Sequence, residues 1–326
     1  MSGCKKNDIN NVTKRFSDKV INSDSYRLVG KMSISSDEEV FNYNFDVKYL
    51  KDNYYKVSLV NLNNNHEQII LRNGESVYVI TPSLNKSFKF QSSWPDNSSQ
   101  SYLLGSILKD INNDNDSKIS REGKLTVITT KVNYPNNSEL ISQKLYFDDK
   151  VNLKKVVVFD QDNNKRIETT FTKIDLKAKN GKDEFDIDEY IKETDDNKTC
   201  SSEECDKTTS NILDDIIYPL YLPNNTYLTS SEKIGDDSSR VILTFSGDKS
   251  FTIIEEVSSI PSSFEIKPVF GNPVFLNDTY GVISDNSISW TRGSVDYYLT
   301  SNNLSNSEMV VIASSMNHSI SVLGSK

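Results

Sequence analysis

Reactive side chains are scarce in this chain of 326 residues, which holds two histidines and three cysteines. His66 and His318 stand far apart in the sequence, whereas nucleophilic catalysis needs a base beside the nucleophile. The chain also lacks a Gly-x-Ser-x-Gly elbow, a glycine-rich phosphate loop and a His-Glu-x-x-His zinc motif. We therefore predict that the protein is not an enzyme and binds no metal or catalytic cofactor.

Three adjacent acid pairs are the remaining candidates for acid–base chemistry: Glu38-Glu39, Asp148-Asp149 and Glu255-Glu256. Adjacent acids on turns or strand edges are usually solvated charges, so we favour that interpretation. The run Asp110–Asp116 is similar to the start of a calcium loop, but an EF-hand loop has glycine at position six and glutamate at position twelve. Asn115 and Arg121 occupy those positions here, which indicates a solvated loop without metal.

The sequence also lacks long apolar runs and an excess of positive charge. No apolar run approaches the roughly 18 residues of a membrane-spanning helix. The net charge is −9 and the sequence pI is about 5.0. A nucleic-acid backbone would be repelled, and no basic stripe interleaved with aromatic residues offsets the overall charge. We therefore exclude nucleic acid as a partner.

The chain opens Met1-Ser2-Gly3-Cys4-Lys5-Lys6. Ser-Gly-Cys is similar to the end of a bacterial lipobox, where a signal peptide is cut before a cysteine that becomes lipid-modified. The apolar signal region is missing, as expected if the numbering starts at a trimmed form. Two interpretations stay open here: a lipid-bearing Cys4 with a polar tether over residues 1–11, or an incidental cysteine in a frayed terminus. Several acyl chains would anchor firmly, since each buried CH₂ contributes about 0.8 kcal/mol.

The other two cysteines, Cys200 and Cys205, lie in the polar run Asp195–Ser210. Their spacing allows a small disulfide loop, which would fit an oxidising, extracytoplasmic location, and two free thiols are equally compatible. Zinc would require two more soft ligands, which this part of the chain does not offer.

Alternation with period two predicts a first domain, residues 12–192, built on an antiparallel sheet. In Phe41–Tyr49, apolar side chains alternate with polar ones, so one strand face is apolar. Similar patterns occur at Tyr55–Leu62, Gln68–Arg72, Ser76–Thr81, Lys124–Asn133, Leu140–Phe147, Lys154–Asp160 and Arg166–Ile174. Helical spacing marks Val12–Asn22 and Ser101–Ile111. We predict a curled half-barrel with helices on its concave side.

A polar linker, residues 193–212, separates this domain from a smaller α+β domain, residues 213–326. The second domain begins with an extended stretch at residues 218–223 and ends with a helix at Asn306–Met316, capped by Ser305 and Glu308. Its strands are predicted at Arg240–Phe245, Ser250–Val257, Ser287–Thr291 and Asp296–Thr300. The fold class of the whole chain is therefore α+β.

The densest aromatic cluster surrounds Trp94-Pro95 and includes Phe88, Phe90 and Tyr102. We favour ordinary core packing for these residues. Their alternative role is to line a concave cavity or a partner-binding edge.

Two stretches resemble a known family. Residues Leu71–Leu104, including Tyr78-Val79-Ile80-Thr81-Pro82 and Trp94-Pro95-Asp96-Asn97, resemble the sporulation and germination lipoproteins of spore-forming Firmicutes, the relatives of the germination lipoprotein GerS. The N-terminal domain of that family is similar to the LolA and LolB lipoprotein carriers. Residues Ile288–Met316 look like the small C-terminal domain found behind many such carriers.

The resemblance implies a lipid of the diacylglycerol type on Cys4 and residence in the developing spore envelope. It also implies a non-enzymatic role as the binding partner of a cell-wall amidase or another cortex-processing protein. The alternative is a lipid or lipoprotein carrier that holds an acyl chain in the half-barrel cavity, which the aromatic face of Phe41–Tyr49 would line. An enzyme with an acidic pair in a cleft is a third hypothesis.

Overall fold

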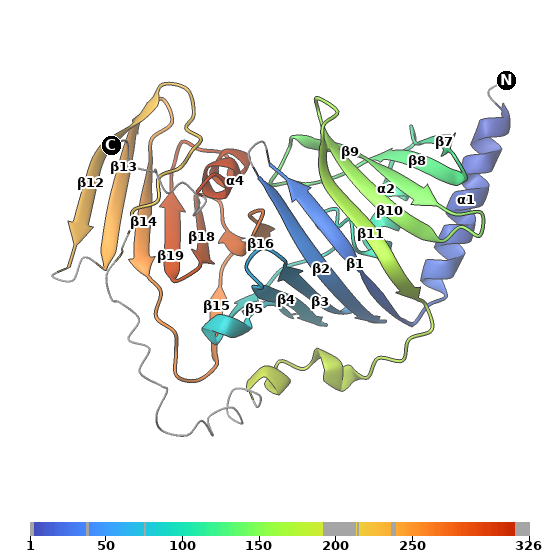
Figure 1. Cartoon of the computed structure of the whole chain (residues 1–326), viewed down its shortest axis with the longest axis horizontal. Coiled ribbons are helices and arrows are strands. Elements are labelled where there is room, and N and C mark those ends of the chain that lie inside the picture. Colours follow the sequence, from blue (N-terminus) through green and yellow to red (C-terminus); the bar gives the residue numbers. More distant parts are fainter. Residues whose placement is uncertain are drawn as a thin grey trace. The chain divides into compact units, whose positions relative to one another are not determined.

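The computed structural model describes residues 3–36, 39–74, 76–191, 213, 215–235 and 239–316, and their side chains from residue 9 onward. The chain forms two compact units (Figure 1). Unit 1 comprises Met1–Thr194 together with Ser263–Pro268, and unit 2 comprises Asp195–Ser262 and Val269–Lys326. The predicted linker, residues 193–212, lies outside the described residues.

Unit 1 is built on an open sheet of twelve strands in the order β15-β6-β5-β4-β3-β2-β1-β11-β10-β9-β8-β7. In this spatial order, every pair of neighbouring strands between β6 and β7 is antiparallel, as predicted. The strands are β1 Ser25–Ser35, β2 Val40–Leu50, β3 Tyr54–Asn61, β4 Glu67–Asn73, β5 Ser76–Thr81, β6 Lys86–Phe90, β7 Lys118–Glu122, β8 Leu125–Lys131, β9 Leu140–Phe147, β10 Leu153–Asp160, β11 Lys165–Asp175 and β15 Glu265–Val269.

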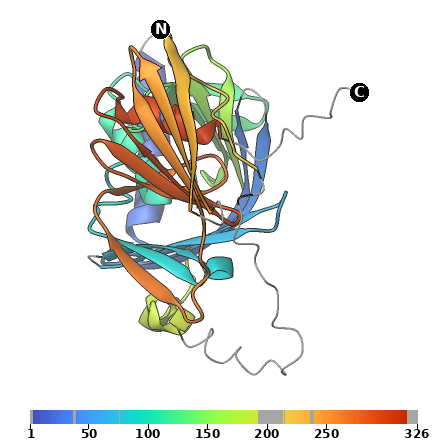
Figure 2. The ribbon, with the colours of Figure 1, turned by 90° about the vertical axis from the view of Figure 1, so that its left-hand side faces the viewer.

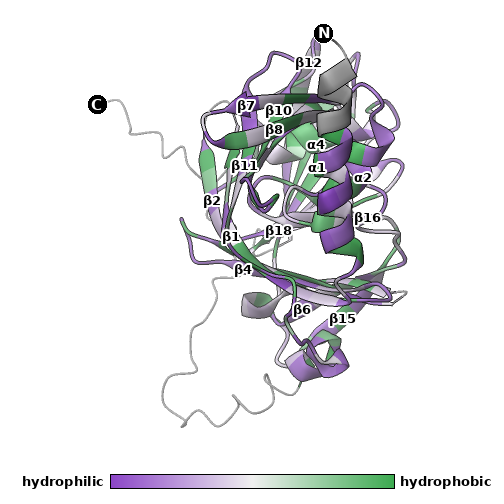
Figure 3. Ribbon diagram, turned by 90° about the vertical axis from the view of Figure 1, so that its right-hand side faces the viewer, coloured by the Kyte–Doolittle hydropathy of each residue, from purple (hydrophilic) through white to green (hydrophobic). Residues whose placement is uncertain are grey.

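Two helices, α1 (Gly3–Ile21) and α2 (Leu104–Asn113), lie on the inner face of this sheet, which bends around them (Figure 3). The predicted α+β half-barrel with helices on its concave side is confirmed. The inner face is apolar because alternate residues of each strand point into it; on β1 these are Tyr26, Leu28, Met32 and Ile34, all buried. Helix α2 contributes the buried side chains Leu104, Ile107, Leu108 and Ile111. Helix α1 begins well before the predicted Val12.

A glycine makes room for the aromatic core of unit 1. A Cβ added to Gly30 of β1 would lie 2.5 Å from Cζ of Phe45. The ring of Phe45, 1% exposed, lies 5.6 Å from that of Phe171 and 6.3 Å from that of Tyr102, measured between centroids. This site therefore requires a residue without a side chain.

Unit 2 has a seven-stranded antiparallel sheet in the order β12-β13-β14-β19-β18-β17-β16, seen in orange and red in Figure 2. Its strands are β12 Thr226–Ile234, β13 Arg240–Gly247, β14 Phe251–Val257, β16 Asn272–Phe275, β17 Tyr280–Ile283, β18 Ser287–Arg292 and β19 Val295–Thr300. Helix α4 (Asn306–Ser314) begins with the predicted capping box between Ser305 and Glu308. Met309, Ile312 and Ala313 of this helix share a core with Trp290.

In the part of the chain that the structure describes, no helix has the length and apolarity needed to cross a bilayer.

Candidate partner-binding site around Trp94

Three tyrosines from neighbouring strands form a row on the inner face of the large sheet. Tyr26 of β1 lies opposite Tyr49 of β2, which lies opposite Tyr55 of β3. The Tyr26 and Tyr49 rings stack with centroids 4.4 Å apart, and the Tyr49 and Tyr55 centroids are 5.0 Å apart. Tyr26 is 1% exposed, whereas Tyr49 and Tyr55 are half-buried. The row therefore connects the core to the surface.

Trp94 closes the row from the loop that connects β6 to α2. Its ring meets that of Tyr55 edge to face, with centroids 6.0 Å apart, and its side chain is only 2% exposed. The Trp94 backbone N–H donates to Oγ of Ser92 at 3.2 Å. The loop is thus held by local hydrogen bonding as well as by ring packing.

Arg72 of β4 holds the same loop through hydrogen bonds. It lies opposite Tyr55 in the strand register and is 8% exposed. Its Nε donates to the carbonyl of Gly74 at 3.0 Å, and Nη1 donates to the carbonyls of Trp94 and Ser93. A buried guanidinium is costly without partners, so this set of acceptors explains why the charge is tolerated here.

The residues of the predicted aromatic cluster all lie in unit 1. Phe90, Trp94, Pro95 and Tyr102 are buried, and Phe88 is half-buried. Such burial is typical of core packing. Tyr49 and Tyr55 next to the cluster are half-buried. The sequence interpretation included Tyr49 in the apolar face of Phe41–Tyr49 but did not single out Tyr55, whose position just after the β2–β3 turn was the available signal.

The tyrosines offer ring faces and neutral hydroxyl groups rather than nucleophiles. Burial raises the pKa of Tyr26 and of Tyr55 well above 10, and the neighbouring Tyr49 adds to both effects. Tyrosine and tryptophan are enriched among the residues that contribute most to binding near the centre of protein interfaces. The half-buried members of the row, Tyr49 and Tyr55, are therefore suited to binding a protein partner.

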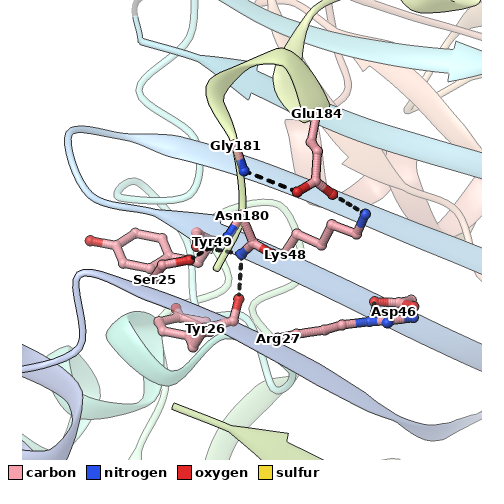
Figure 4. Close-up of polar contacts among 9 residues, drawn as sticks. All are labelled: Ser25, Tyr26, Arg27, Asp46, Lys48, Tyr49, Asn180, Gly181 and Glu184. Atoms are coloured by element: carbon pink, nitrogen blue, oxygen red, sulfur yellow. Dashed lines mark hydrogen bonds and ion pairs between the residues drawn. The ribbon is translucent and has the colours of Figure 1, made fainter. Parts of the chain in front are cut away.

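On the outer face, the chain that follows β11 crosses strands β1 and β2 (Figure 4). Nδ2 of Asn180 donates to the carbonyls of Tyr26 and Tyr49 at 3.0 and 2.8 Å. Glu184 accepts from the backbone N–H of Gly181 at 3.0 Å and forms an ion pair with Lys48. These contacts fix the crossing segment on the sheet.

Further along, the same segment packs on β4 and β5 through apolar side chains. Phe185 and Ile187, both buried, pack on a cluster formed by Ile69, Leu71, Tyr78 and Ile80. The edge of the Phe185 ring meets Tyr54, with centroids 5.7 Å apart. The chain itself therefore covers this part of the outer face.

The calcium-like run is solvated only in part, because residues 112, 113, 115 and 116 are exposed whereas Asp110 is buried. Asp110 is buried on α2 and accepts from Oγ of Ser99 at 2.8 Å and from Nε2 of Gln143 at 2.9 Å. Asp114 accepts from the backbone N–H of Lys131 at 2.8 Å. Gln143 lies on β9 and Lys131 on β8, so Asp110 and Asp114, the residue that follows α2, connect this helix to both strands. Among the described residues no metal-binding group of carboxylate, histidine or cysteine side chains occurs.

The other candidates fall in scattered places. His66 lies in the β3–β4 turn, and its Nδ1 is 3.4 Å from Oγ of Ser83. Glu255 is fully buried, so its predicted place among solvated charges is wrong, while its neighbour Glu256 pairs with Arg240 on the opposite face. Cys200, Cys205 and His318, as well as the side chain of Cys4, lie outside the described residues.

No family model matches the sequence. Among solved structures, the chain is similar to one chain of the structure of the CwlD amidase from Clostridioides difficile in complex with the GerS lipoprotein (18% identity, TM-score 0.31, 50% of this chain and 92% of that chain). It is also similar to the LolA superfamily protein NE2245 of Nitrosomonas europaea (10% identity, TM-score 0.33, 55% of this chain and 98% of that chain).

Among curated proteins, the chain is 36% identical to the sporulation protein YdcC of Bacillus subtilis over 321 residues, which are 97% of this chain and 92% of that protein. This match confirms the predicted resemblance to sporulation proteins. The chain belongs to the family of the Bacillus subtilis sporulation protein YdcC.

Proposed function

We propose that this protein is an extracytoplasmic lipoprotein, anchored through a lipid on Cys4, that binds a peptidoglycan-modifying enzyme during sporulation or germination without catalysing a reaction itself. The observation that carries the proposal is the membership of nearly the whole chain in a sporulation-protein family. The resemblance of residues Leu71–Leu104 to germination lipoproteins supports a cell-wall amidase or another cortex-processing protein as the partner.

The tyrosine row supplies the contact surface in this proposal. Tyr49 and Tyr55 present half-buried rings, and the Arg72 hydrogen bonds hold the Trp94 loop beside them. A partner would meet side chains that are already ordered, so binding would cost little conformational entropy.

The carrier alternative receives less support from the inner face. An acyl chain needs an apolar cavity, but Phe45 is in ring contact with Tyr102 and Phe171, and α2 turns four buried apolar side chains toward the same face. Native mass spectrometry distinguishes the two functions, because a carrier would retain a lipid of defined mass.

Affinity capture from sporulating cells tests the proposed function. The tagged full-length protein is expected to recover a peptidoglycan-modifying enzyme, and the double variant Tyr49→Ala/Tyr55→Ala is expected to recover at least tenfold less. Tyr227→Ala is the matched control, because Tyr227 is 60% exposed on the edge strand β12 of unit 2. Capture of no wall enzyme, together with normal germination of a deletion strain, would contradict the proposal.

A further inference from the structure

A carboxyl group lies inside the core of unit 2. Glu255 of β14 is 0% exposed and stands on the inner face of the sheet, between Val241 of β13 and Tyr297 of β19. Val241 and Tyr297 belong to the apolar cluster of this unit. A carboxylate in such surroundings loses its hydration, and only specific partners can compensate for that loss.

The partner of Glu255 is a backbone group. Oε2 accepts from the N–H of Ile217 at 3.2 Å. Ile217 belongs to residues 215–223, the extended stretch that leads into β12 and that we call the entry segment. Ile216, Ile217 and Leu222 of this segment pack on the core cluster, and the backbone N–H groups of residues 220 and 221 donate to Ser315 just after α4.

No cation compensates the carboxyl group in the described part of unit 2. The buried Arg292 at the end of β18, two strands away from β14, is bonded to Asp278 and to the carbonyl of Met316. From α4, Glu308 pairs with Lys249, and from the entry segment, Asp215 is exposed. Among the described residues, Oε1 of Glu255, the hydroxyl of Tyr297 and Nε1 of Trp290 have no hydrogen-bond partner.

We propose that the protonation state of Glu255 controls whether the entry segment stays packed on the sheet. We call the contact between Glu255 and this segment the Glu255 clasp. The neutral carboxyl group accepts the Ile217 N–H within the core and keeps the segment packed on the sheet. The charged carboxylate gains hydration when the segment lifts away, so loss of the proton loosens the clasp.

The pH range follows from the sign of the linkage. Burial raises the pKa of Glu255 from 4.5 to about 7, although the hydrogen bond from Ile217 lowers it. Between these two values the clasped state binds more protons than the open state, in which the entry segment has lifted from the sheet. The equilibrium constant for opening therefore rises by about tenfold per pH unit from about 4.5 to about 7 and is constant above that range. The full difference corresponds to roughly 300-fold in the opening equilibrium.

Hydrogen exchange of the full-length protein measures this opening. The protection factor of the Ile217 amide, corrected for intrinsic exchange at each pH, is expected to fall about 40-fold between pH 5 and pH 7. In Glu255→Gln, the neutral amide still accepts the N–H, so the protection factor is expected to stay within about threefold over the same range. Glu256→Gln changes the adjacent half-buried residue on the opposite face and is expected to behave like the wild type.

Equal pH dependence in the wild type and in Glu255→Gln would overturn the proposal. A carbon-13 titration of the Glu255 carboxyl in the wild type gives a second readout that needs no variant. An apparent pKa near 4.5 in that titration would also overturn it.

Discussion

At the scale of single residues, buried polar side chains join parts of unit 1 that are distant in the sequence. Arg72 connects β4 to the Trp94 loop, and Asp110 connects α2 to β9 through Gln143. Each of these groups has at least one partner that lies more than 20 residues away. Their loss should therefore affect stability more than the loss of an exposed charge.

The first prediction concerns Arg72. Arg72→Lys keeps the charge but cannot reach the carbonyls of Gly74, Ser93 and Trp94 in the same planar arrangement. We expect the free energy of unfolding of unit 1 to fall by about 2 kcal/mol in urea titrations that follow Trp94 fluorescence. Arg121→Lys, at an exposed ion pair with Asp149, should change it by less than about 0.5 kcal/mol. Equal effects of the two substitutions would contradict this assignment.

The second prediction concerns Asp110, whose pKa burial raises to about 6 although Ser99 and Gln143 donate to it. The folded state therefore binds more protons than the unfolded state between pH 3.8 and about 6. The free energy of unfolding of unit 1 should decrease over that range by up to about 3 kcal/mol as the pH rises. In urea titrations across this range, Asp110→Asn should lack this contribution. An unchanged pH profile in the variant would show that Asp110 is not the group responsible.

The sequence could not reveal the state of Asp110, because the local composition of aspartate and asparagine is typical of a solvated turn. Its buried state depends on Gln143, which is 33 positions away and belongs to another strand. Glu255 was misassigned for the same reason, since a glutamate pair gives no sign of which member faces the core. The aromatic cluster around Trp94 was predictable, because its members are close in the sequence.

At the scale of elements, segments outside the regular strands complete the packing of unit 1. The segment around Phe185 covers the outer face over β4 and β5, and β15 extends the sheet beyond β6. The alternation in Phe41–Tyr49 predicted β2 well, because both faces of that strand follow period two. The sequence offered no comparable signal for β15, since Pro268 and charged residues occupy it and its strand partner is far away in the chain.

The third prediction concerns the crossing segment. Phe185 is 1% exposed, so Phe185→Ala should lower the free energy of unfolding of unit 1 by about 3–4 kcal/mol and increase hydrogen exchange in residues 181–190. Phe270→Ala removes a ring that is 95% exposed and should change stability by less than about 0.5 kcal/mol. A Phe185→Ala variant as stable as the Phe270→Ala variant would contradict the packing described here.

At the scale of the whole molecule, two antiparallel sheet units carry different polar features. Unit 1 holds the tyrosine row beside Trp94, and unit 2 holds the Glu255 clasp. Membership in the YdcC family extends over both units, because the match covers 97% of the chain. The α+β class and the antiparallel pairing followed from the residue pattern, whereas the proposed partner rests on the resemblance of residues Leu71–Leu104 to germination lipoproteins.

The most direct measurement is an amidase assay on purified peptidoglycan, with each wall amidase of the host in the presence and absence of the purified full-length protein. The account predicts that one amidase forms a complex with the protein and changes its rate at least tenfold, that Tyr49→Ala/Tyr55→Ala abolishes this effect, and that the protein alone cleaves nothing. Cleavage by the protein alone, or no complex and no rate change with any of the amidases, would contradict it.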